Sequence, residues 1–125
     1  MNIEEAKIIA VDFDGTLVEV GHPYPKIGKL KKDAKKVINK LYDDGYYIII
    51  WTCRGDVALD EMIKFLNRNK INYDKVNENA DYDIIGIKPL PKIFYNYLID
   101  DRCLLDLPDW KTIYKIITGV KYEKD

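Results

Sequence analysis

The sequence has 125 residues, of which 47% are hydrophobic and 33% are charged, a composition that predicts one globular domain over residues 1–125. The 20 Lys and Arg residues nearly balance the 21 Asp and Glu residues, and the net charge of −1 argues against a general nucleic-acid-binding surface while leaving room for a local cationic pocket. There is neither a run of about 18 apolar residues nor a basic and apolar leader, so we expect no membrane span, no signal peptide and a cytoplasmic protein.

The first predicted element is a buried strand at residues 7–12, which ends in acidic residues. Asp12 and Asp14 are one residue apart, so their side chains share a face of an extended chain, and Gly15 permits a sharp turn after them. Two carboxylates at this spacing repel each other unless a cation or a shared proton compensates their charge. Mg2+ prefers such oxygen ligands together with substrate phosphate, and a carboxylate can also be a nucleophile that forms an aspartyl-phosphate.

The next three segments predict an irregular stretch, a helix and a second strand. Residues 17–29 contain two prolines and two glycines, which bar a regular helix. In residues 30–42 the apolar side chains recur at three- and four-residue steps between lysines, as in an amphipathic helix with a solvated lysine face. Residues 46–51 are β-branched and aromatic and predict a buried parallel strand, whose carboxyl end joins that of the first strand at one edge of the sheet.

The middle of the chain predicts a second helix, a third strand and a loop. Asp56 is a good N-cap for the helix, and residues 71–76 predict a short strand. Residues 77–91 carry glycine and proline breaks and predict a loop or a single turn, and long loops in compact domains are usually functional. Cys53 and Cys103 lack the spacing of a zinc or redox site, so we interpret both as small buried packing residues.

The end of the chain predicts a fourth strand at residues 95–99 and a terminal helix. Asp100 and Asp101 follow that strand. Adjacent side chains on a strand point to opposite sides, so these two carboxylates are not expected to be equivalent ligands. The helix should contain Pro108 in its first turn, and residues 121–125 should fray.

Four stretches together resemble the haloacid dehalogenase (HAD) superfamily of phosphohydrolases. They are, in order, Asp12-Phe13-Asp14-Gly15-Thr16, Thr52, Lys88-Pro89 and Ile99-Asp100-Asp101-Arg102. The resemblance covers most of residues 7–102 and implies an α/β fold of three layers, Rossmann-like, with a mainly parallel sheet of order 4-1-2-3. It places a hairpin flap in residues 17–29, where composition alone equally allows a plain surface loop. Neither this segment nor residues 77–91 is long enough for a cap domain.

The resemblance implies a Mg2+-dependent phosphomonoester hydrolase. Asp12 would attack the phosphorus, and Asp14 would protonate the leaving oxygen and later activate water. Thr52 would donate a hydrogen bond to the phosphate, although a cap at the strand end is the alternative for this residue. The guanidinium of Arg54 is a planar fork that suits phosphate oxygens.

The resemblance also implies a metal site. The ligands would be Asp12, the backbone carbonyl of Asp14, and Asp100. Asp101 would then be the water-linked or orienting partner, and the order of Asp100 and Asp101 stays open.

A lysine that holds the phosphoryl group is either Lys88 or Lys92. Lys88 precedes a proline, as in the third motif of the superfamily, whereas small relatives can carry a lysine closer to the last motif, as Lys92 is here. In an extended chain at about 3.3 Å per residue, Lys92 would lie roughly 26 Å from Asp100, which favours Lys88.

Other functions remain open. A different phosphoryl-transfer or dehalogenase activity is possible on the same scaffold, although a dehalogenase would not need Asp14. A non-catalytic binding or regulatory module is the alternative outside the enzymes. The expected partner is a phosphorylated substrate, and a second copy of the chain, as a homo-oligomer, would be one way to close a site that has no cap.

Overall fold

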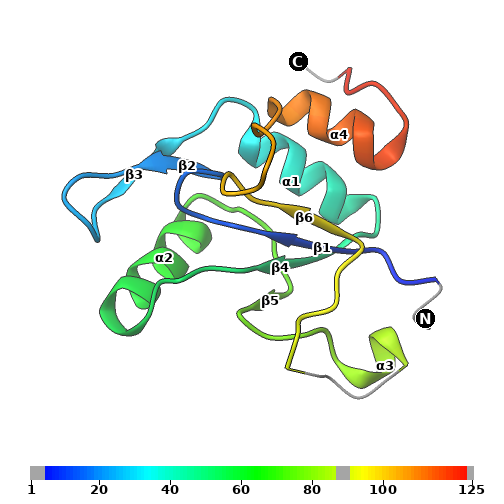
Figure 1. Ribbon diagram of the computed structural model, residues 1–125, viewed down its shortest axis with the longest axis horizontal. Coiled ribbons are helices and arrows are strands. Elements are labelled where there is room, and N and C mark those ends of the chain that lie inside the picture. The colour runs from blue at the N-terminus through cyan, green and yellow to red at the C-terminus, as the bar shows by residue number, and fades with distance from the viewer. Residues whose placement is uncertain (1–4, 87–90, 124–125) are drawn as a thin grey trace.

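A parallel four-stranded sheet forms the centre of the computed structural model, which describes residues 5–86 and 91–123 (Figure 1). Its strands are β1 (Ile8–Val11), β4 (Tyr47–Ile50), β5 (Lys75–Val76) and β6 (Tyr97–Ile99). They lie in the order β5-β4-β1-β6. With these four strands numbered along the chain, this arrangement is the predicted order 4-1-2-3.

Both faces of the sheet are covered. The helices are α1 (Ala34–Asp43), α2 (Asp56–Arg68), α3 (Tyr82–Ile85) and α4 (Trp110–Thr118). One apolar cluster joins side chains of α1, α2 and α4 to Ile9, Val11, Ile48 and Ile50. A second cluster joins Ala80, Ile85 and Ile93 to Ile8, Ala10 and Ile49. Alternate residues of β1 and β4 thus face opposite layers, which confirms the predicted α/β fold of three layers.

A hairpin follows β1 in the chain and lies beyond the carboxyl end of that strand (Figure 1). It consists of β2 (Val18–Val20) and β3 (Ile27–Leu30), which pair antiparallel as a separate sheet. Gly28 lies so close to the backbone carbonyl of Glu19 that a Cβ atom would overlap with it. The segment is therefore the hairpin flap of the HAD resemblance and not a plain loop.

One helix begins later, and another begins one residue earlier, than their sequence patterns suggest. The predicted helix at residues 30–42 starts at Ala34, because Leu30 is paired in β3 and Asp33 has a left-handed backbone with φ of 65°. Asp56 is the first residue of α2, and Gly55 takes the N-cap position predicted for Asp56. The third strand is also shorter than predicted, since only Lys75–Val76 pair with β4.

The chain end differs from its prediction in two ways. Pro108 precedes α4, whose N-cap is Asp109, and the Asp109 carboxylate accepts a hydrogen bond from the backbone N–H of Thr112. Tyr122, in the segment expected to fray, is buried and packs edge-on against Tyr114 at 5.3 Å between ring centroids. The aromatic contact fixes the chain after α4.

No helix within the described residues is long and apolar enough to span a lipid bilayer. Within the same residues, the two segments considered for a cap hold only the hairpin and the four-residue α3.

Two residues of α2 should differ in how much they stabilise the fold. Leu66 is completely buried and Val57 is 67% exposed. We expect Leu66→Ala to lower the free energy of unfolding by about 2–5 kcal/mol, because the cavity cannot be filled, and Val57→Ala to change it by less than about 0.5 kcal/mol. Urea unfolding followed by circular dichroism measures both, and equal losses would contradict the packing described here.

Candidate active site

Two neighbouring strands end at the same place with acidic residues. Val11 and Ile99 are partners in the register of β1 and β6, and the backbone N–H of Asp12 donates to the Ile99 carbonyl at 2.9 Å. Asp12 and Asp100 therefore leave the sheet side by side. Strand order reverses between these two strands, and that position at the carboxyl ends is where open α/β sheets bind their ligands.

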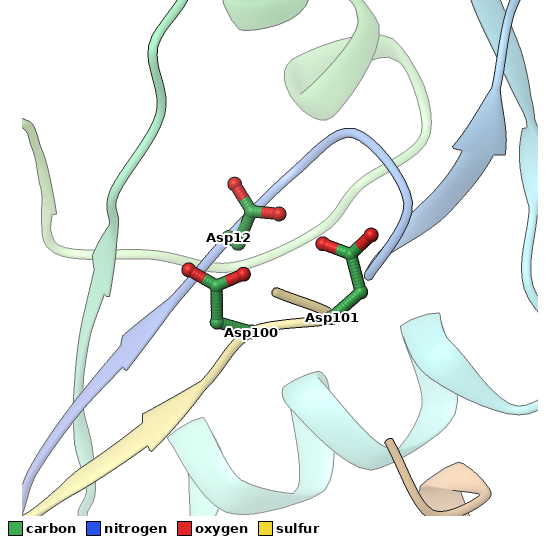
Figure 2. Close-up of side chains that lie close together, drawn as sticks. All are labelled: Asp12, Asp100 and Asp101. Atoms are coloured by element: carbon green, nitrogen blue, oxygen red, sulfur yellow. The ribbon is translucent and has the colours of Figure 1, made fainter. Parts of the chain in front are cut away.

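Three carboxylates converge there, from Asp12, Asp100 and Asp101 (Figure 2). One oxygen atom from each lies within 4.8 Å of the others. The expectation that Asp100 and Asp101 point to opposite sides is wrong, because β6 ends at Ile99 and the alternation of a strand does not extend past it. A set of three carboxylate oxygens suits a hard divalent cation, so the cluster could hold a metal ion.

Thr16 connects the carboxylates and is itself completely buried. Its hydroxyl lies 3.1 Å from both Asp12 Oδ2 and Asp101 Oδ1 and accepts the backbone N–H of Asp101 at 3.0 Å. The Trp110 indole N–H of α4 donates to the Thr16 carbonyl at 3.1 Å. The sequence analysis gave neither Thr16 nor Trp110 a role in the site. For Thr16, the available signal was a threonine two residues after Asp14.

Gly15 allows this arrangement. Its φ of +84° is in the left-handed region, and a Cβ atom at this position would overlap with the Asp101 carboxylate. Any other residue would force the Asp101 side chain to move.

Asp14 is not part of the three-carboxylate group and is instead paired with Arg54. The guanidinium donates from Nε to Asp14 Oδ2 at 2.7 Å and from Nη2 to Asp14 Oδ1 at 2.8 Å. Arg54 is only 3% exposed. The fork that was predicted for a phosphate group is thus occupied by the second aspartate of the first motif.

Thr52 lies after β4 and is held by Asn77, which follows β5. The Thr52 N–H donates to Asn77 Oδ1 at 2.8 Å, and Asn77 Nδ2 donates to the Thr52 carbonyl at 2.9 Å. Thr52 Oγ1 accepts the backbone N–H of Arg54 at 3.1 Å, which is the behaviour of a cap at a strand end. No hydrogen bond among the described residues uses its hydroxyl proton. No signal in the sequence pointed to Asn77.

A family model described as haloacid dehalogenase-like hydrolase matches residues 9–82, more than half of the chain. The chain belongs to the HAD-like hydrolases. This membership supports a hydrolase on the HAD scaffold.

The solved structures agree with this membership. A conserved protein from Bacteroides thetaiotaomicron is 33% identical and superposes with a TM-score of 0.78 over 92% of each chain. The structure of a Pnkp1/Rnl/Hen1 complex is 22% identical, with a TM-score of 0.57 over 78% of this chain and 40% of that one. The structure of the Pnkp1/Rnl/Hen1 RNA repair complex is 22% identical, with a TM-score of 0.58 over 82% and 38%. The last two likenesses show the fold alone. No curated protein matched the sequence.

The structure describes one of the two candidate lysines of this HAD-like hydrolase, Lys92. Lys92 is exposed and lies before β6, whereas the acidic cluster follows the other end of that strand. Between them, the Asn96 N–H donates to the Ile8 carbonyl at the amino end of β1. Lys92 is therefore not part of the site that the described residues form. Lys88 lies outside the described residues.

Both cysteines are exposed, so their interpretation as buried packing residues is wrong. Cys53 and Cys103 follow the ends of β4 and β6, in loops that lie outside the sheet. β4 ends at Ile50 and β6 ends at Ile99, so neither cysteine is part of the apolar strand that precedes it.

The cluster raises the pKa of Asp12 from 3.8 to about 7. Burial is the largest cause, followed by the hydrogen bond with Asp101 and the negative charge of Asp100. Hydrogen bonds from the Thr16 hydroxyl and the Phe13 N–H act in the opposite direction.

This pKa predicts how pH affects the metal-free protein. The folded state binds the Asp12 proton more tightly than the unfolded chain, so the resulting stability is complete below about pH 4 and is lost as the pH rises to about 7. With chelator present, we expect the melting temperature of the wild type to fall more between about pH 5 and about pH 8 than that of Asp12→Asn. Titrating groups away from the three-carboxylate cluster are common to both proteins and cancel. Equal falls in the two melting temperatures would contradict the shift.

Proposed function

We propose that this HAD-like hydrolase is a Mg2+-dependent phosphomonoester hydrolase that acts through an aspartyl-phosphate. The observation that supports this most is the position of Asp12, which extends β1 into the three-carboxylate cluster at the point where strand order reverses. A carboxylate so placed can reach a phosphoryl group held over the cluster.

Two chemical steps follow from these roles. In the first, an Asp12 carboxylate oxygen bonds to the phosphorus, the bond to the leaving oxygen breaks, and the Asp14 carboxyl donates its proton to that oxygen. In the second, a water molecule attacks the phosphorus and gives its proton to Asp14. The bond between Asp12 and phosphorus breaks, which releases phosphate and restores Asp12.

The residues present fit a magnesium ion, because Asp12, Asp100 and Asp101 offer only oxygen atoms at mutual distances within 4.8 Å. The backbone carbonyl of Asp14 is a further proposed ligand. Bound there, Mg2+ would neutralise the repulsion between the carboxylates and an anionic phosphoryl group.

Thr52 and Lys88 are the proposed contacts to the phosphoryl oxygens. The Thr52 hydroxyl retains a proton to donate, since its described hydrogen bond is one that it accepts. Comparing Lys88→Ala with Lys92→Ala tests the lysine, and we favour Lys88 because Lys92 precedes the far end of β6.

A substrate screen tests the proposed function. It should include phosphorylated sugars, nucleotides and oligonucleotides with a 3′- or 5′-phosphate, each with Mg2+. Oligonucleotides are included because one structure that shares the fold is that of an RNA repair complex. Absence of phosphate release from every class, by protein shown to be folded, would refute the proposal.

The two aspartates of the first motif should differ in their effects. We expect Asp12→Asn to reduce phosphate release to background, because the amide is nearly isosteric but is not a nucleophile. Asp14→Asn should lower kcat by about 10²–10⁴-fold, because it removes proton transfer. Asp83→Asn, at an exposed aspartate of α3, is the control for the same chemical change. Near-normal turnover by Asp12→Asn would refute the covalent mechanism.

Metal removal should abolish activity without unfolding the protein. We expect a chelator to stop phosphate release and excess Mg2+ to restore it, while circular dichroism stays unchanged because neither apolar cluster includes the three carboxylates. Full turnover in excess chelator would exclude the proposed metal role.

A further inference from the structure

Arg54 makes contacts with three separate parts of the chain. Its Nε and Nη2 atoms hold both oxygens of Asp14, at 2.7 and 2.8 Å. Its Nη1 atom donates to the Pro25 carbonyl of the flap at 2.9 Å, and to the Ala58 carbonyl of α2 at 3.4 Å. One planar group thus links the candidate acid, the flap and a helix.

Aromatic rings also restrain the guanidinium. Its Cζ atom lies 5.4 Å from the ring centroid of Phe13, in the first motif, and 5.4 Å from that of Tyr24, in the flap. Phe13 is completely buried, whereas Tyr24 is 65% exposed. The Phe13 side of the contact is therefore fixed by the core, and the Tyr24 side depends on where the flap lies.

We propose that Arg54 is a positioning residue that couples the flap to Asp14. The five donors of a guanidinium have fixed relative directions, so a flap that moves the Pro25 carbonyl or the Tyr24 ring must rotate the fork that holds the Asp14 carboxylate. A substrate that displaces the flap would thereby redirect Asp14 toward the leaving oxygen. This inference rests on the proposed function, in which Asp14 supplies and accepts the proton.

The coupling can be tested with two esters that differ in their need for an acid. An alkyl phosphate requires protonation of its leaving oxygen, whereas p-nitrophenyl phosphate has a stable leaving group and does not. Arg54→Lys retains the charge but loses the fork. We expect kcat/KM to fall at least about tenfold more for the alkyl phosphate than for p-nitrophenyl phosphate, since acid catalysis is worth about 10²–10⁴-fold. A merely structural role would lower both values alike, and that result, or no loss for either ester, would overturn the proposal.

The flap side is tested by Tyr24→Leu, whose exposed position makes a folding defect improbable even if Arg54→Lys is unstable. It should shift the ratio of the two kcat/KM values in the same direction by a smaller factor. The double variant should match Arg54→Lys alone, because both changes act on one restraint. Multiplied effects would mean that Tyr24 acts separately, which would also overturn the coupling.

The matched control is Arg68→Lys, which changes another arginine stacked on a phenylalanine, Phe65 at 5.8 Å. Arg68 ends α2 and makes none of the described contacts with Asp14 or the flap, so the ratio should not change.

A wild type that is inactive on both esters and on every substrate class of the screen would instead refute the proposed function. Amide hydrogen exchange of the variants then tests the coupling without a measurement of activity. Arg54→Lys and Tyr24→Leu should each speed exchange in residues 22–26 and in residues 13–16 together. Faster exchange in only one of these segments would overturn the coupling.

Discussion

Repulsion among three carboxylates is the constraint on which the site depends. Asp12, Asp100 and Asp101 are brought together by the pairing of β1 with β6, and burial, followed by the hydrogen bond with Asp101 and the charge of Asp100, raises the pKa of Asp12 to about 7. The surrounding chain holds them against this repulsion, through the Thr16 hydroxyl between two of them and through Trp110, which fixes Thr16 from α4. The terminal helix therefore stabilises the site as well as the core.

The same region separates the two aspartates of the first motif. Asp12 faces like charges and is partly buried, whereas Asp14 faces the Arg54 guanidinium. Two carboxylates only one residue apart thus have opposite surroundings. The flap residue Pro25 contacts Arg54, which holds Asp14. None of the described contacts joins Pro25 to Asp12.

Local pattern predicted the buried parallel strands, because such strands are continuous apolar runs, and the edge that their carboxyl ends share. The strand order and the meeting of Asp12 with Asp100 were implied by the resemblance to the HAD superfamily. That the Asp101 carboxylate points to the same place as that of Asp100 could not be predicted, since it depends on β6 ending at Ile99, and element ends are the least regular part of a pattern. The Arg54 contact could not be predicted either. It is a pairing between residues 40 positions apart in the sequence, and it depends on how the flap and α2 meet.

In the proposed mechanism, Asp12 bonds to phosphorus beside a metal ion held by its neighbours. A crystal structure with Mg2+ and beryllium fluoride, which mimics a phosphoryl group on a carboxylate, tests this directly. We expect beryllium to be bonded to an Asp12 carboxylate oxygen, with Mg2+ within ligand distance of Asp12 and of Asp100 or Asp101. Beryllium bonded to any other side chain, or Mg2+ bound away from this cluster, would contradict it.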